Sequence, residues 1–327
     1  TNDSTVSWLW DTNYWLAVSN TAGGVLSGAT SGWYIAGSSA TVTATPSANY
    51  HFVDWTGDVQ GDTTNPVMTV TMGYARSLTA HFAIDRHSLV VSSPLGSPSP
   101  AVGTNIYDYG SSIDVAVTNS PIPVGLTTQY VCTGWTGSGS VAVLGIGTNA
   151  GPVTLTNDST VSWLWDTNYW LAVSNTAGGV LSGATSGWYI AGSDATVTAT
   201  PSANYHFVDW TGDVQGDTTN PVMTVAMGYT RSLTAHFAID PHSLIVTSPL
   251  NPCTPPVGSN VYDYGSVIDV AVTNPTVISG VTTQYVCTGW TGSGSVAVLG
   301  IGTNAGPVTL TNDSTVSWLW DTNYWLA

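Results

Sequence analysis

The sequence contains no lysine and no glutamate, and its only arginines are Arg76, Arg86 and Arg231. All 19 acidic residues are aspartates, and the formal net charge is −16 at pH 7. Nucleic acids are bound through lysine and arginine, so a chain this acidic is not expected to have a nucleic-acid partner. The same charge disfavours docking on anionic lipid. With no lysine, trypsin-like proteases have few places to cut, which suits a protein outside the cell; a compositional drift of the organism is the alternative explanation.

Long apolar runs are also absent. No stretch approaches the roughly 18 residues of a membrane span, so we expect no membrane insertion in this segment. Lysine and glutamate are good helix formers, and their place is taken by Thr, Val, Trp and Tyr, which favour strands. Apolar residues make up 43% of the chain, enough to fill hydrophobic cores. The composition therefore predicts an all-β protein.

The chain repeats itself. The 17 residues Thr1–Ala17 return unchanged at Thr156–Ala172 and at Thr311–Ala327, so both offsets are 155 residues. Residues 1–155 and 156–310 differ at 20 positions, of which 17 lie between Arg86 and Leu126. Repetition of this kind favours a function that gains from each added copy, such as length or many weak contacts, over a single active site.

Each 155-residue unit is predicted to hold two unlike modules, because the Trp-Thr-Gly motif recurs within it at Trp55 and Trp135. Type 1 and type 2 modules then alternate along the chain. The predicted boundaries are 12–84 (module 1, type 1), 87–165 (module 2, type 2), 167–239 (module 3, type 1) and 242–320 (module 4, type 2). Residues 1–10 read as the last strand of a preceding module, and 321–327 as the start of the next.

Apolar and polar residues alternate in segments such as 40–46, 66–72, 77–82 and 159–165, which predicts strands. Gly-, Asn- and Asp-rich turns separate them, for example at 22–24 and 61–66. Strands at such short intervals predict a tandem array of small antiparallel β-sheet modules without helices of consequence. Since an isolated strand is unstable in water, residues 1–10 are expected to be completed by a neighbouring copy, through chain continuity or strand donation.

Residues 15–82 resemble the divergent internalin-type B-repeat, a small β domain found in tandem in bacterial surface and secreted proteins. The matching residues are Thr41-Val-Thr-Ala-Thr45, Tyr50, Phe52, Trp55, Gly57, Asn65-Pro66, Val70-Thr-Met72 and Leu78-Thr-Ala-His-Phe82. Residues 170–237 match equally, whereas modules 2 and 4 match only in part. The resemblance implies an extracellular, non-catalytic spacer or adhesive module, and it implies no ligand.

The linkers between modules are short, and each begins with an aspartate: Asp11, Asp85, Asp166, Asp240 and Asp321. Short linkers without glycine restrict domain motion and predict an elongated, stiff rod. Two roles are open for the joint aspartates. The side chain can hydrogen-bond backbone N–H groups in a turn, or it can help to bind a metal ion.

Calcium is also a candidate ligand of a Gly-rich loop in the type 1 modules. The loop places three carboxylates within nine residues in each copy: Asp54, Asp58, Asp62, and Asp209, Asp213, Asp217. Ca²⁺ prefers clustered oxygen ligands on flexible loops, but the spacing is not that of an EF-hand. Turn formation by these aspartates is the alternative. No other cofactor is expected.

The three cysteines are Cys132, Cys253 and Cys287. Cys132 and Cys287 are equivalent and align with Phe52, an expected core position. Cys253 has no counterpart, since Pro98 occupies its place. A Cys253–Cys287 disulfide within module 4 is therefore possible and would suit an oxidising compartment.

The 15 tryptophans can serve as core residues or as platforms for sugars. Four equivalent ones are predicted to anchor the module cores: Trp55, Trp135, Trp210 and Trp290. No metal-binding histidine motif and no Gly-x-Ser-x-Gly elbow is present, so the chain is not expected to be an enzyme. Together these features predict a section of a long extracellular fibre or stalk whose partners are neighbouring copies of itself. The alternative is a surface adhesin that binds glycans or a cell surface through its repeats.

Overall fold

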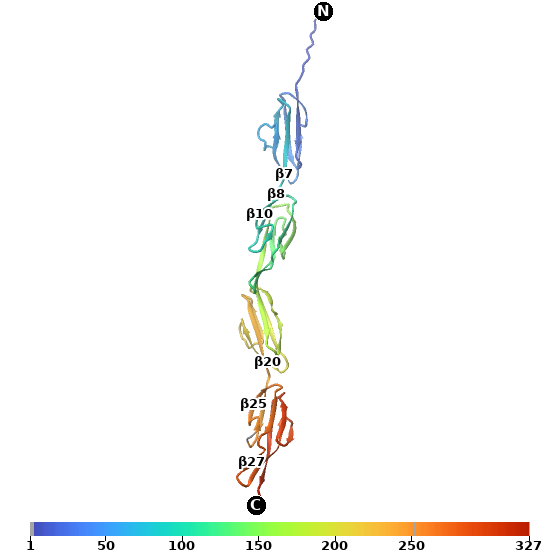
Figure 1. Ribbon diagram of the computed structural model, residues 1–327. Coiled ribbons are helices and arrows are strands. Elements are labelled where there is room, and N and C mark those ends of the chain that lie inside the picture. Colours follow the sequence, from blue (N-terminus) through green and yellow to red (C-terminus); the bar gives the residue numbers. More distant parts are fainter. Residues whose placement is uncertain (1–2, 251–252, 327) are drawn as a thin grey trace. The chain divides into compact units, whose positions relative to one another are not determined.

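The computed structural model describes residues 3–250 and 253–326, and this part of the chain is built of β-strands without a helix (Figure 1). The all-β prediction is therefore confirmed. Among these residues there is also no helix that could cross a membrane. The chain divides into two compact units, residues 1–124 with 129–167 and residues 125–128 with 168–327.

Module 1 packs a four-stranded sheet of order β3-β1-β7-β5 against a three-stranded sheet of order β2-β4-β6. Its strands are β1 (Asn13–Asn20), β2 (Gly24–Gly28), β3 (Gly32–Ile35), β4 (Ser39–Pro46), β5 (Tyr50–Gly57), β6 (Val67–Thr71) and β7 (Arg76–Ile84). Alternate side chains of both sheets fill one core, which contains Leu16, Val42, Trp55 and Val70. The period-two sequence pattern thus places one face of each strand inside.

Module 3 repeats this arrangement, with sheets of order β18-β16-β22-β20 and β17-β19-β21. Its strands are the second half of β16 (Ser159–Asn175), β17 (Gly179–Gly183), β18 (Gly187–Ile190), β19 (Asp194–Pro201), β20 (Tyr205–Gly212), β21 (Val222–Ala226) and β22 (Arg231–Ile239). The core residues are the equivalents of those in module 1.

Module 2 has a larger sheet, β10-β8-β16-β13-β12 with β14 paired to β13, and a smaller one, β15-β11-β9. Its strands are β8 (Arg86–Ser92), β9 (Pro98–Ser99), β10 (Gly103–Asp108), β11 (Ser112–Val117), β12 (Ile122–Val124), β13 (Thr128–Ser138), β14 (Leu144–Ile146), β15 (Asn149–Thr154) and the first half of β16. Trp135 and Trp163 lie in its core.

Module 4 has the same layers, β25-β23-β31-β28-β27 with β29 on β28, and β24-β26-β30. Its strands are β23 (Pro241–Thr247), β24 (Cys253–Thr254), β25 (Gly258–Asp263), β26 (Val267–Val272), β27 (Thr276–Ser279), β28 (Thr283–Ser293), β29 (Leu299–Ile301), β30 (Asn304–Thr309) and β31 (Ser314–Tyr324).

One pairing departs from the antiparallel arrangement expected from the sequence. In each module the first and last strands are neighbours and run parallel, as in β1 with β7, where Leu16 lies opposite Arg76 and Asn20 opposite Ala80. The equivalent pairs are β8 with β16, β16 with β22, and β23 with β31. Strand alternation reveals which face is buried but carries no information on strand direction.

The strand expected at residues 1–10 is not formed in the described part of that segment, residues 3–10. Residues 3–10 belong to no strand, and the side chains of Val6, Trp8 and Trp10 are exposed. Residues 1 and 2 lie outside the described part. The same sequence in β16 pairs with β8 and β13, which bury Val161 and Trp163. No described segment supplies such neighbours to residues 3–10.

Candidate functional site

Asp85 joins module 1 to module 2 through hydrogen bonds to both. Its backbone N–H donates to the carbonyl of Asn49 at 2.9 Å, and its own carbonyl accepts the N–H of Tyr109 at 2.8 Å. Its carboxylate lies 3.0 Å from Nδ1 of His51. Because Asn49 and His51 belong to module 1 and Tyr109 to module 2, this one residue contacts both modules.

Asp240 makes the same contacts between modules 3 and 4. Its N–H donates to Asn204 at 2.9 Å, its carbonyl accepts from Tyr264 at 2.9 Å, and its carboxylate lies 3.0 Å from Nδ1 of His206. Asn204, like Asn49, has a φ of 65°, a left-handed conformation that asparagine tolerates better than most residues. The joint is therefore a repeated structural element.

The other joint aspartates occupy different surroundings. Asp166 lies inside β16, and Asp321 lies inside β31 opposite Val286, so a continuous strand stands where the sequence suggested a turn. The reason is that β16 finds neighbours along its whole length, first β8 and β13, then β18 and β22. Asp11 precedes β1 and is exposed.

The carboxylates of the Gly-rich loop each bond to a different part of the backbone. Asp58 Oδ2 accepts the N–H of Ser77 at 2.9 Å. Asp62 Oδ1 accepts the N–H and the hydroxyl of Thr64 at 2.9 and 2.7 Å. These bonds lower the pKa of Asp62, and the bond from the Thr64 hydroxyl has the largest effect. Asp54 lies opposite His81 in the β5–β7 ladder.

The buried guanidinium of Arg76 is hydrogen-bonded to the backbone of this loop. The side chain of Arg76 is stacked on Tyr74, and its Nη1 donates to the backbone carbonyl of Asp58 at 2.8 Å. Its Nε donates to the carbonyl of Thr71 at 3.0 Å. The positive charge of Arg76 thus lies against the backbone of the loop, which opposes the binding of a cation there.

Module 3 repeats the loop. Asp213 accepts the N–H of Ser232 and Asp217 bonds Thr219, while Arg231 binds the Asp213 carbonyl. Asp209 lies 3.9 Å from His236. In the part of the chain that the structure describes, no group of three or more His, Cys or Asp side chains is placed to hold a metal ion. The loop aspartates, although close in sequence, therefore do not form a metal-binding cluster in the described structure.

The four anchor tryptophans Trp55, Trp135, Trp210 and Trp290 are all buried in module cores. The indole N–H of Trp55 donates to the carbonyl of Asn65 at 3.1 Å. Trp135 packs edge-on against Trp163, and Gly145 lies so close to its ring that a Cβ there would fall 2.0 Å from it. These rings stabilise the cores and present no face to a ligand.

A second set of tryptophans lies on the outer face of the type 1 modules. Trp15 on β1 and Trp33 on β3 are cross-strand partners whose rings stack edge-to-face at 5.4 Å. Trp170 and Trp188 form the same pair in module 3, at 5.3 Å. Trp33 is 69% exposed, whereas Trp188 is 37% exposed.

A loop of residues 125–128 contacts this face of module 3. The carbonyl of Thr127 accepts the N–H of Trp170 at 2.9 Å and the hydroxyl of Thr230 at 2.8 Å. In module 1 the position of Thr230 is occupied by Ala75, which has no hydroxyl to donate. The outer aromatic pair of module 3 therefore lies beside a loop that belongs to the same compact unit.

Comparison with known families identifies the type 1 modules. Residues 14–86 and 169–241 each match the divergent InlB B-repeat domain. Modules 1 and 3 are divergent InlB B-repeats. This family suggests a surface repeat protein. No curated protein and no solved structure matches the chain.

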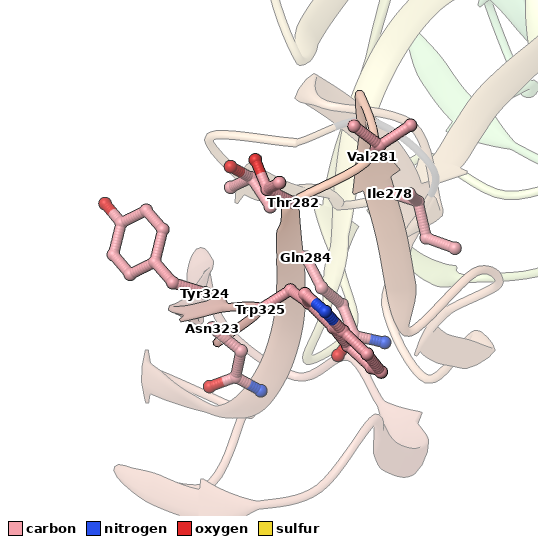
Figure 2. Close-up of a pocket in the computed structure, with 8 residues that line it drawn as sticks. Ile278, Val281, Thr282, Gln284, Asn323, Tyr324 and Trp325 are labelled. Carbon is pink, nitrogen blue, oxygen red and sulfur yellow. The ribbon is translucent and has the colours of Figure 1, made fainter. Parts of the chain in front are cut away.

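A shallow groove of about 300 Å³ lies at the end of module 4, which follows the second B-repeat. It is lined by Ile278, Val281, Thr282, Thr283, Gln284, Asn323, Tyr324 and Trp325. The rings of Tyr324 and Trp325 point in opposite directions (Figure 2), and Trp325 is 76% exposed. Trp325 is the equivalent of Trp170, which is half-buried against Trp188. The groove offers stacking and hydrogen-bonding groups but no pair of ionisable side chains suited to catalysis.

The structure holds Cys132, Cys253 and Cys287 as free, buried thiols, so the predicted Cys253–Cys287 disulfide is not formed in it. Both residues belong to the core of module 4, but Cys253 lies on β24 and Cys287 on β28, which are strands of different sheets. Burial raises the pKa of all three thiols. They are therefore poorly reactive in the folded protein.

Two sets of contacts escaped sequence reasoning. Asp158 accepts the N–H of Ser88 at 2.7 Å and its hydroxyl at 3.1 Å, and His87 lies 3.7 Å away. These hydrogen bonds lower the pKa of Asp158, and the bond from the Ser88 N–H has the largest effect. The sequence draws attention to Asp158 only through an Asn-Asp-Ser motif, which does not reveal a partner 70 residues away. The Thr127–Thr230 bond spans 103 residues and has no local signature either.

Proposed function

We propose that this chain is a section of an extracellular fibre or stalk of a bacterial cell surface, built by tandem repetition of B-repeat and B-repeat-like modules. The role is non-catalytic and needs no cofactor. The two family matches support the surface setting. The near-identity of the two 155-residue units supports a function that grows with repeat number.

The observation that carries the proposal is the recurrent joint at Asp85 and Asp240. In both places the linking residue bonds the modules on either side, with distances that agree within 0.1 Å. A flexible tether needs no such contacts, whereas a fibre needs each module to be held by the next. The joint thus suits extension by repetition.

The partners in this proposal are neighbouring copies of the same repeat. Residues 3–10 carry the sequence that β16 buries between β8 and β13, and here their apolar side chains are exposed. A type 2 module of a neighbouring copy would supply strands equivalent to β8 and β13. The scarcity of exposed positive charge disfavours nucleic acid as an alternative partner.

Electron microscopy of the native material with an antibody against the repeat tests the proposal. We expect labelled filaments or stalks outside the cell with a regular axial spacing. Dispersed monomers, or label confined to the cell interior, would exclude a fibre. Proteolysis of intact cells provides a second check, because an extracellular repeat is removed while cytoplasmic proteins remain.

Glycan binding is a second candidate, and the open Trp15–Trp33 pair favours it. Aromatic rings on a surface rich in hydroxyl groups can stack on the faces of sugar rings. A glycan array with the wild-type protein and with Trp33→Ala separates the two functions. Binding that depends on Trp33 would support an adhesin, whereas binding to no glycan would leave the fibre as the better account.

A further inference from the structure

Every module pairs its first strand with its last. In module 1, β1 and β7 run parallel with Leu16 opposite Arg76 and Asn20 opposite Ala80. In module 3, the second half of β16 pairs with β22 in the same register. In modules 2 and 4, β8 pairs with β16 and β23 pairs with β31. This topology is common to both module types although their remaining strands differ.

Tension along the chain enters a module through its first strand and leaves through its last. When these two strands are parallel neighbours, the pulling directions are opposite and lie along the strands. The hydrogen bonds between them run across the strands, so they are loaded together in shear. When two strands are instead pulled apart from the same end, their bonds break one at a time.

We propose that this strand pair is a load-bearing clamp, which gives each module high resistance to tension between its chain ends. The clamp goes beyond the proposed fibre, because it belongs to the single module and serves an adhesin as well as a stalk. Resistance to force is set by the rate of unfolding and not by equilibrium stability. The structure therefore assigns a mechanical role to β1 and β7 that the other sheet of module 1 does not share.

Side chains reinforce the clamp in module 1. The hydroxyls of Ser19 and Thr79 lie 2.8 Å apart across β1 and β7. The N–H of Thr21 donates to the carbonyl of Ala80, and Thr21 Oγ1 accepts the N–H of Phe82, both at 2.9 Å. Module 3 repeats the hydroxyl pair as Ser174 and Thr234, at 2.9 Å.

The second sheet of each type 1 module offers a matched control. Thr41 and Thr69 form a similar hydroxyl pair at 2.9 Å, but across β4 and β6, which are neither first nor last. Thr196 and Thr224 repeat this pair in module 3. Removing either kind of pair deletes the same chemical groups, yet only the Ser19–Thr79 type lies between the strands that carry the load.

Single-molecule force spectroscopy of the full chain tests the clamp. Pulled from its two ends, the protein should unfold in discrete events, and each 155-residue unit should release roughly 510–560 Å of extended chain. Attachment at Asn13 and Ala75 instead pulls β1 and β7 of module 1 from the same end. We expect that geometry to unfold module 1 at a force several-fold lower.

The variants supply the second measurement. Thr79→Ala with Thr234→Ala should lower the unfolding force of two modules, whereas Thr41→Ala with Thr196→Ala should leave all forces unchanged. Equilibrium unfolding of both double variants in urea shows that each is folded. Equal forces in the two pulling geometries, or equal effects of the two double variants, would overturn the proposal.

Discussion

Thr230 donates its hydroxyl to the backbone carbonyl of Thr127 at 2.8 Å, and so fastens the 125–128 loop to the second B-repeat. Thr230→Ala should release this loop and lower the free energy of unfolding by about 1 kcal/mol or less, since the hydrogen bond is exposed. Hydrogen exchange at the Trp170 amide, which bonds the same carbonyl, should become faster. Ala75→Thr in module 1 is the control, and it should change nothing at Trp170. Unaltered exchange in Thr230→Ala would show that the loop is held by other contacts.

Trp210 should be indispensable to its module. Its ring is buried in the core of module 3, and truncation to alanine leaves a large cavity. We expect Trp210→Ala to lower the free energy of unfolding of that module by about 3–5 kcal/mol, measured by chemical denaturation. Trp33→Ala, on the exposed face, is the comparison and should cost far less. Equal costs would mean that Trp33 is buried by a partner in solution.

Acid should weaken module 2 through Asp158. Its pKa is lowered in the folded state by the bonds from Ser88, so these bonds contribute stability above the ordinary aspartate pKa of about 3.9. That contribution is lost as the pH falls through the lower folded pKa. Asp158→Asn should flatten the fall in melting temperature below about pH 4, and the exposed Asp3→Asn should not. If the melting temperatures of Asp158→Asn and Asp3→Asn fell equally with pH, Asp158 would have no such role in acid sensitivity.

Thiol titration should count three free cysteines per chain. In the structure Cys253 and Cys287 are unpaired, on strands of different sheets. Reaction with a thiol reagent should be slow in the native protein, because burial raises the thiol pKa, and should reach all three after unfolding without a reductant. A count of one would instead establish the disulfide bridge within module 4.

A chelator should leave the melting temperature unchanged. The loop aspartates Asp58 and Asp62 are bonded to backbone and hydroxyl groups, and Arg76 holds the Asp58 carbonyl. Calcium at a hundredfold excess over its dissociation constant would add about 2.7 kcal/mol, so its removal is measurable by calorimetry. A lower melting temperature confined to the type 1 modules, whose loops alone carry the three aspartates, would show that these loops bind calcium.

Local patterns predicted much of the fold. The alternation at 40–46, 66–72 and 77–82 corresponds to β4, β6 and β7, because half-buried strands impose a period of two. Short strands of module 2 such as β9 and β14 have too few residues to show that period. The parallel direction of β1 and β7 depends on chain topology and leaves no trace in either strand alone.

The joints show why the site was only partly predictable. The short linkers pointed to Asp85 as a special residue, but His51 lies 34 positions earlier and carries no sign of the pairing. The aspartates of the Gly-rich loop were conspicuous in sequence because they are close along the chain. In space each one bonds its own part of the backbone, since a turn satisfies carboxylates locally.

Because two of the three arginines are buried, the fixed charges on the surface of the molecule are almost all negative. Arg76 and Arg231 are 6% and 4% exposed, and at the place of the exposed Arg86 the second unit has Pro241. Adjacent chains would therefore repel one another over a distance set by ionic strength, about 8–10 Å in physiological salt. In the proposed fibre, side-by-side association of chains should therefore depend on the medium: low ionic strength should keep the chains apart, whereas high salt, or acid that protonates the aspartates, should let them associate.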